Sequence, residues 1–135
     1  MSINTLKILE WNVGKGREAQ HSLLNDEETN QFNLLLLSEP YRFIPKNQEN
    51  PIAPQHHYWE TVIPTKFSKT SYDKNNFRSM IYVNKRIPFK QIPIPHVDLT
   101  VVTIKRGEIT YLVVPVYAYY HPNKSQRERE LQNLL

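Results

Sequence analysis

The sequence predicts an α/β fold, and three features of the 135-residue chain point to it. Residues 6–13 and residues 32–37 are apolar and of strand length, and a stretch with helical spacing lies between them. The order strand, helix, strand is that of a βαβ unit. Farther on, residues 97–104 and 109–117 flank a short polar turn, which is typical of an antiparallel hairpin. We therefore expect a layered α/β domain.

The first three elements each have a local signal. The strand at residues 6–13 ends at Gly14 and Gly16, which indicate a turn. Residues 17–30 place apolar side chains at helical spacing among polar ones, which predicts an amphipathic helix. Residues 32–37 form an apolar run without alternation, so we expect both faces of that strand to be covered.

The remaining chain is irregular before it becomes regular again. Prolines interrupt residues 40–76, where only residues 58–63 read as a short strand. Residues 80–84 form the next expected strand, and residues 97–104 the one after it. A Lys-Arg-Gly-Glu turn at residues 105–108 then leads into the last strand of the hairpin.

The end of the sequence indicates an unfinished domain. Ser125 is a candidate N-cap for a helix over residues 126–135, which carries Leu131, Leu134 and Leu135 on one side. These leucines need a packing partner that the sequence does not supply. We therefore expect the chain to be a truncated domain.

The composition is that of a globular domain without cysteine chemistry. Hydrophobic residues make up 39% of the chain and charged residues 22%. Because there is no cysteine, disulfides and cysteine-held zinc are excluded, and an intracellular location is expected. No apolar run approaches the roughly 20 residues that span a bilayer, so no membrane is expected as a partner. The net charge of +4 and the pI near 9.3 weakly favour a polyanionic partner.

Asn12 and Glu39 are the first candidate site residues. Each lies at the carboxyl end of an expected buried strand, where open α/β sheets place their ligands. A divalent cation such as Mg²⁺ would compensate an ionised Glu39 there, and the Asn12 amide suits a phosphate or a metal-bound water. The alternative is structural: Asn12 caps a turn, and Glu39 pairs with a nearby Arg or Lys. Spacing alone favours that alternative.

Tyr117 is the third candidate. It lies at the end of the last expected strand, and its phenol suits a hydrogen bond to a phosphate oxygen. Tyr119 and Tyr120 follow closely, so position alone does not choose among the three. Most such tyrosines pack with the hydroxyl at the surface.

Two segments carry a resemblance to the endonuclease/exonuclease/phosphatase superfamily. Residues 8–16, Ile-Leu-Glu-Trp-Asn-Val-Gly-Lys-Gly, resemble its opening strand, where an asparagine lies beside the metal. Residues 32–41, Phe-Asn-Leu-Leu-Leu-Leu-Ser-Glu-Pro-Tyr, resemble its second strand, which ends in the metal-binding glutamate. The Glu-Pro-Tyr ending is similar to that of the endonucleases of non-LTR retrotransposons.

Later segments extend the resemblance in the right order. Residues 58–60, Tyr-Trp-Glu, and residues 78–85, Arg-Ser-Met-Ile-Tyr-Val-Asn-Lys, are similar to the strands that follow in that group. Residues 114–122, Val-Pro-Val-Tyr-Ala-Tyr-Tyr-His-Pro, resemble the strand end with the active-site tyrosine, and Tyr117 is the match. No single motif is specific, but the ordered set reverses the preference at Asn12 and Glu39.

The resemblance implies a fold, an activity and a cofactor. The fold would be half of a four-layer α/β sandwich, with mixed, largely antiparallel sheets and outer helices. Residues 1–135 would be the amino-terminal part of one such domain, with the carboxyl half absent. The activity would be metal-dependent phosphodiester hydrolysis by a DNA endonuclease of retrotransposon type. Such an endonuclease would be intracellular and would act in the nucleus. Glu39 with Asn12 would hold Mg²⁺ or Mn²⁺, and Asn12 and Tyr117 would steady the phosphate.

The sequence also departs from the family. An Asp-x-Asn motif and an Asp-His pair are expected after the tyrosine strand, whereas the only Asp-x-Asn here, at residues 73–75, precedes it and reads as a coincidence. Pro115 stands where asparagine is common. The histidines other than His21 read as solvated loop residues rather than a catalytic base: His56, His57, His96 and His121.

These departures leave three hypotheses. The chain alone is expected to lack nuclease activity, because the general base would come from the absent half. A phosphatase of the same fold acting on a phosphoinositide or another small phosphate ester is the second hypothesis. A non-catalytic remnant or nucleic-acid-binding fragment is the third. Without the other half, the inner face of the strands at Met80, Val97 and Ile109 is expected to be partly exposed.

Overall fold

The structure, a computed structural model, describes residues 5–65, 77–94, 96 and 98–115. Its elements in chain order are β1 (Ile8–Asn12), α1 (Arg17–Asn25), the 3₁₀ helix η1 (Glu27–Gln31), β2 (Leu34–Ser38), β3 (Trp59–Val62), β4 (Ser79–Asn84), β5 (Lys90–Ile92), β6 (Val101–Arg106) and β7 (Ile109–Val113). They form a four-stranded sheet of order β1-β2-β4-β3 and a three-stranded sheet of order β5-β6-β7. Within the described residues no helix is long and apolar enough to cross a membrane.

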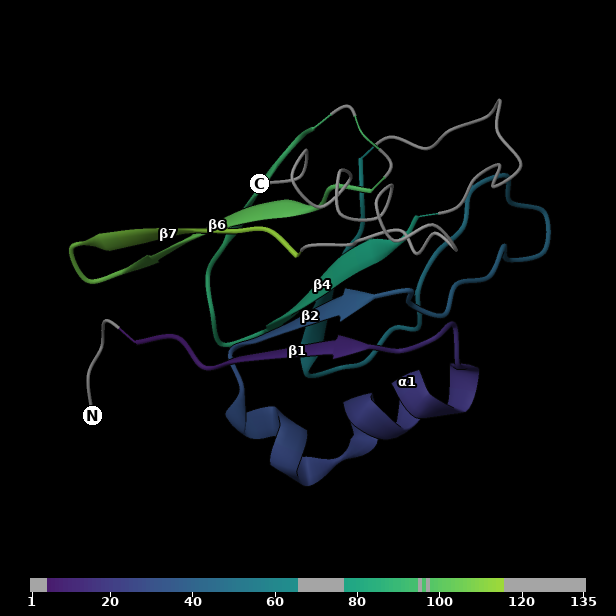
Figure 1. The fold of residues 1–135 in the computed structure, drawn as a ribbon, viewed down its shortest axis with the longest axis horizontal. Coiled ribbons are helices and arrows are strands. Elements are labelled where there is room, and N and C mark those ends of the chain that lie inside the picture. Colours follow the sequence, from purple (N-terminus) through teal and green to yellow (C-terminus); the bar gives the residue numbers. More distant parts are fainter. Residues whose placement is uncertain (1–4, 66–76, 95, 97, 116–135) are drawn as a thin grey trace, which may run out of the picture.

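The elements stack in three layers. Helix α1 lies on one face of the four-stranded sheet, and the three-stranded sheet lies over the other face (Figure 1). Alternate residues of β2 point to opposite faces of the sheet. Leu35 and Leu37 pack in the core between the sheet and α1, whereas Leu34 and Leu36 pack in the core between the two sheets. The expectation that this strand is covered on both faces is confirmed, since all four leucines are buried.

The pairing in the four-stranded sheet gathers three strand ends at one edge. Strands β1 and β2 are parallel, with Asn12 opposite Ser38, as the βαβ order predicts. Strand β4 runs antiparallel to β2, with Ser38 opposite Ser79. The carboxyl ends of β1 and β2 therefore lie beside the amino-terminal end of β4. We call this the β2 carboxyl edge.

Two expected elements have different boundaries. The helix expected over residues 17–30 breaks after Asn25, because Asp26 is extended and its carboxylate accepts the N–H of Glu28 to begin η1. In the hairpin, Lys105 and Arg106 belong to β6 because they pair with β7, so the turn is shorter than residues 105–108. Strand β6 also begins at Val101, later than expected, and the three-residue β5 was not expected at all.

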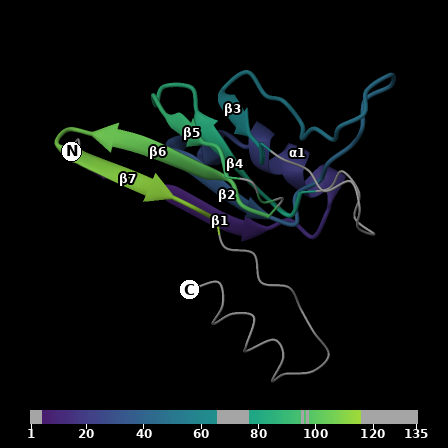
Figure 2. The same cartoon turned by 90° about the horizontal axis from the view of Figure 1, so that it is seen from above.

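The exposure expected for the inner strands is found for the strand at Ile109, which is β7, and not for the strand at Met80, which is β4. Every residue of β4 is buried, because α1 and the three-stranded sheet cover its two faces. Exposed apolar side chains lie on the outer strands β1 and β7, among them Trp11, Ile109 and Leu112. Figure 2 shows these two strands on the same side of the molecule. Val97, Tyr117, His121, residues 73–75 and the helix expected at residues 126–135 lie outside the described residues.

Candidate functional site

The backbone holds Glu39 at the β2 carboxyl edge from both sides. Its N–H donates to the carbonyl of Arg78 at 2.9 Å, and its carbonyl accepts the N–H of Lys15 at 2.7 Å. One residue earlier, the Ser38 carbonyl accepts the N–H of Val13 at 2.9 Å. Glu39 is therefore fixed between the chain that leaves β1 and the chain that enters β4. The structure thus brings Asn12 and Glu39 to one edge of one sheet.

Glu39 has a left-handed backbone conformation, with φ of 46°. That region costs an L-residue about 1–2 kcal/mol, and the residue before a proline, here Pro40, normally prefers an extended conformation. Such a conformation persists only where the surroundings impose it, and it is found most often at functional sites. The main-chain bonds to Lys15 and Arg78 provide that constraint.

The Glu39 carboxylate has no partner among the described residues. Its side chain is half-buried, and no hydrogen bond or ion pair to it is found in that part of the chain. The structural alternative, in which Glu39 stands there to pair with a basic side chain, therefore has no support from the described residues. A half-buried carboxylate without compensation is suited to a cation.

Asn12 combines a structural bond with open hydrogen-bonding capacity. Its Oδ1 accepts the N–H of Gly14 at 2.9 Å, so it caps the turn after β1, as the structural alternative proposed. Gly14 and Lys15 both have φ of 62° in this turn. The Asn12 side chain is exposed, and its Nδ2 makes no hydrogen bond within the described residues. The amide can therefore still donate to a ligand.

A buried polar network supports the segment after Glu39. Gln20 of α1 is fully buried; its Nε2 donates to the Tyr82 hydroxyl at 2.9 Å, and its Oε1 accepts the N–H of Tyr41 at 2.7 Å. The Tyr82 hydroxyl in turn donates to the Pro54 carbonyl at 2.8 Å, and burial raises the pKa of Tyr82. Sequence reasoning missed Gln20. Its signal was a polar residue one helical turn from the apolar Leu24.

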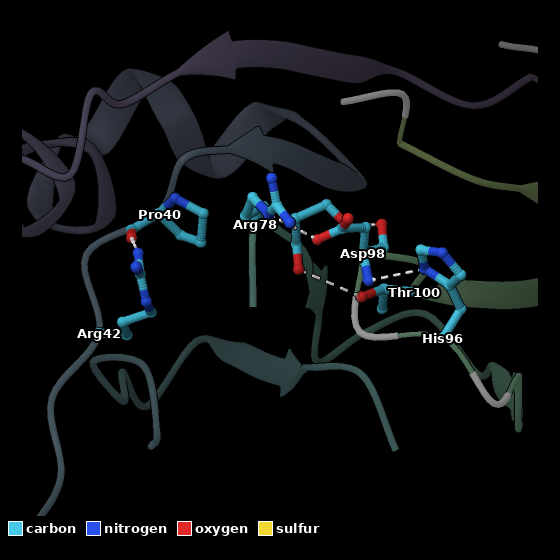
Figure 3. A network of polar contacts seen from close by, with 7 residues as sticks. Pro40, Arg42, Arg78, His96, Asp98 and Thr100 are labelled. Carbon is cyan, nitrogen blue, oxygen red and sulfur yellow. Dashed lines mark hydrogen bonds and ion pairs between the residues drawn. The ribbon is translucent and has the colours of Figure 1, made fainter. Parts of the chain in front are cut away.

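A second network joins the two sheets at Arg78, whose carbonyl accepts the N–H of Glu39; Figure 3 shows this network. Arg78 Nε lies 3.0 Å from Asp98 Oδ1. The Ser79 hydroxyl donates to the Asp98 carbonyl at 2.7 Å, and the Thr100 hydroxyl donates to the Ser79 carbonyl at 3.2 Å. These contacts connect the start of β4 to the segment that enters β6. Neither Arg78 nor Asp98 was a candidate from the sequence.

The topology also directs β7 towards this edge. Val113, the last residue of β7, pairs with Val102 near the start of β6. The chain entering β6 is tied to β4 through the Thr100 and Ser79 bond. Tyr117 follows four positions after Val113, outside the described residues, so its assignment stays a prediction.

The donor set fits one class of cation better than others. Within the described residues, no three or more His, Cys, Asp or Glu side chains gather into a metal-binding group. The described residues therefore offer no cage of three or more such side chains to a metal. Mg²⁺ keeps several waters and is often held by one or two carboxylates together with a substrate phosphate. A single accessible carboxylate at Glu39 fits that mode.

Two of the loop histidines cap turns. His56 Nδ1 accepts the N–H of Tyr58 at 3.1 Å, and His96 Nδ1 accepts the N–H of Asp98 at 3.0 Å. His57 is exposed and its ring lies against Tyr58, with 4.1 Å between the ring centroids. These roles agree with the expectation that the histidines serve loops.

Comparison with known proteins identifies the fold. No protein-family profile and no curated protein matches the sequence. A solved structure does: the endonuclease domain of TRAS1, a telomere-specific non-LTR retrotransposon, matches with a TM-score of 0.61 and 16% identity. The match covers 96% of this chain and 52% of that chain. The chain therefore has an endonuclease-type α/β fold, as the resemblance implied, and spans about half the length of the domain it matches.

Proposed function

We propose that this chain supplies the metal-binding edge of a DNA-cutting phosphodiesterase, with Glu39 as the carboxylate ligand of Mg²⁺ or Mn²⁺. The observation that carries the proposal is the state of Glu39. It is half-buried, left-handed in its backbone and without a partner among the described residues, at the end of a central strand. The fold supports the same reading, because the matched structure is an endonuclease domain.

In this proposal each candidate residue has a separate role in binding the cation or the phosphate. Glu39 would hold the cation, which would supply charge to polarise the phosphodiester and stabilise the leaving oxygen. Asn12 donates from its exposed amide to a phosphate oxygen, while its Oδ1 keeps the turn after β1 in place. Tyr117, which lies outside the described residues, is assigned by the resemblance alone to donate from its phenol to the same phosphate. The net charge of +4 favours contacts to the DNA backbone.

The chain by itself is expected to bind the cation without cutting DNA. Hydrolysis also needs a general base to activate water, and His56 and His96 each use Nδ1 to cap a turn. We expect purified protein to leave supercoiled plasmid intact in Mg²⁺. Nicking that disappears in Glu39→Ala would contradict this expectation and would place a complete site in these 135 residues.

Cation binding tests the proposal directly. Mn²⁺ titration by calorimetry should give a binding isotherm for the wild type and none for Glu39→Ala. Glu108→Gln is the matched control, because it removes an exposed carboxylate from the β6–β7 turn. Equal Mn²⁺ binding by the wild type and by Glu39→Ala would refute the assignment of Glu39.

The same preparations separate the alternatives. Salt-dependent binding to DNA, without Glu39-dependent Mn²⁺ binding, would favour a non-catalytic nucleic-acid-binding role. Release of phosphate from a phosphoinositide, with no effect on plasmid, would favour a small phosphate ester as substrate. Neither binding nor hydrolysis would favour a remnant without activity.

A further inference from the structure

We infer that Asp98 is a positioning residue that holds the Arg78 guanidinium away from Glu39 and so keeps the Glu39 carboxylate available to a cation. The inference rests on the proposed function and adds to it. It assigns a role to the ion pair between Arg78 and Asp98, two residues that lie outside β1 and β2. It also explains why a carboxylate so close to an arginine has no ion-pair partner among the described residues.

Arg78 is one of two basic residues whose main chain is hydrogen-bonded to that of Glu39, Lys15 being the other. Their backbones are joined directly, because the Glu39 N–H donates to the Arg78 carbonyl at 2.9 Å. Ser38 and Ser79 are paired across β2 and β4. Glu39 follows Ser38 and Arg78 precedes Ser79, so the two residues lie opposite each other. Arginine at that separation normally forms a charge-assisted, two-point contact with a carboxylate. Such a contact would occupy the oxygens that a cation needs.

The structure shows the arginine engaged with Asp98. Arg78 Nε lies 3.0 Å from Asp98 Oδ1, and the two side chains are only 27% and 22% exposed. Asp98 Oδ1 is buried and accepts no hydrogen bond within the described residues, so the charge of Arg78 is its compensation there. Figure 3 shows Arg78 turned towards Asp98 rather than towards the chain at Pro40.

The position of Asp98 does not depend on its carboxylate. Its N–H donates to His96 Nδ1 at 3.0 Å, and its carbonyl accepts the Ser79 hydroxyl at 2.7 Å. Both contacts use main-chain atoms of Asp98. The substitution Asp98→Asn therefore removes the charge that holds Arg78 and keeps the turn and the link between the sheets. It therefore tests the ion pair separately from the turn and the link between the sheets.

Releasing Arg78 should weaken cation binding through Glu39. In Asp98→Asn the guanidinium loses this ion pair, and we expect it to turn to the carboxylate of Glu39, whose main chain is bonded to that of Arg78, and to compete with the cation. Substitutions that reposition a metal ligand lower metal affinity about 10- to 100-fold, and we expect a loss of about tenfold in Mn²⁺ affinity. Replacing Arg78 in the same background, as Asp98→Asn with Arg78→Gln, removes the competitor and should restore wild-type affinity.

The experiment is Mn²⁺ titration of five proteins, with thermal unfolding of each as a check on folding. They are the wild type, Asp98→Asn, Arg78→Gln, the double variant and the charge control Glu108→Gln. Weak binding by Asp98→Asn together with recovery in the double variant supports the inference, because a role confined to structure would not produce rescue by a second substitution. The control should bind as the wild type does.

Two outcomes overturn the inference, and they differ in what else they overturn. If the wild type binds Mn²⁺ through Glu39 and Asp98→Asn binds equally well, or if the double variant is not rescued, only the role of Asp98 is refuted. If the wild type shows no Glu39-dependent binding, the proposed function fails and the inference fails with it.

Discussion

The two ends of the four-stranded sheet carry polar residues in opposite states. At the end where β4 finishes, which we call the closed end, Asn84 is 2% exposed and its side-chain amide is hydrogen-bonded through both polar atoms. Its Nδ2 donates to Asn30 Oδ1 at 3.1 Å, and its Oδ1 accepts Arg86 Nε at 3.0 Å. At the β2 carboxyl edge, the Glu39 carboxylate has no partner among the described residues, and its backbone is left-handed.

The contrast separates polar residues that build the fold from those held ready for a ligand. A buried polar group with all its bonds made stabilises the structure and restricts the chain. A carboxylate kept unpaired in a strained conformation lowers stability, and that is tolerated where a ligand supplies the missing partner. Substitutions at the two ends should therefore change stability in opposite directions.

The largest expected effect is at the closed end. Asn84→Ala leaves Asn30 and Arg86 without their buried partner and should lower the free energy of unfolding by about 2–3 kcal/mol. Urea unfolding followed by tryptophan fluorescence measures it. Asn50→Ala, in an exposed loop, is the control and should change little. A small effect of Asn84→Ala would remove the distinction between the two ends.

At the β2 carboxyl edge, a substitution is expected to raise the free energy of unfolding rather than lower it. Glu39→Gly relieves a left-handed conformation and should raise the free energy of unfolding by about 1 kcal/mol, after the entropy of glycine is counted. Glu39→Ala is the matched control, because it removes the carboxylate and keeps the backbone strain. Both variants should lose Mn²⁺ binding. A Glu39→Gly protein less stable than Glu39→Ala would show that the φ of 46° is not strained.

The smallest effect concerns pH at the closed end. Burial, then the charges of His57 and Lys85, lower the pKa of His56 below its ordinary 6.5. The folded state therefore favours neutral His56; this contribution is present above pH 6.5 and is lost as the pH falls towards the lower folded pKa. His56→Asn can keep the bond from the Tyr58 N–H without titrating. It should lose less stability than the wild type between pH 7 and pH 5, measured by urea unfolding in matched buffers.

The sequence was informative where a signal is local. The apolar run before Glu39 predicts a strand covered on both faces, and the spacing from β1 predicts the shared edge with Asn12. Strand β5 was missed because its three residues pair only through contact with β6. The helix boundary was missed because Asp26 caps a new turn within a stretch that has helical spacing.

The features of the site that matter most depend on distant contacts. The conformation of Glu39 is set by a hydrogen bond to Arg78, and the partner of Arg78 is Asp98, from a loop before another sheet. No spacing rule connects these positions. Gln20 was visible only as a polar residue on an apolar helix face, and its meaning required Tyr82 and Tyr41 to be placed around it.

The strand order has a consequence for how the protein is made. Strand β4 is synthesised after β1, β2 and β3, yet it lies between β2 and β3. A nascent chain on the ribosome can pair β1 with β2 early, but the N–H of Glu39 gains its carbonyl acceptor only when Arg78 has emerged. Because such non-local pairing is slow, the edge that holds Glu39 should be among the last parts to assemble. A stalled chain that ends before β4 would leave one edge of β2 unpaired and its Leu34 and Leu36 face uncovered, and such a surface promotes aggregation.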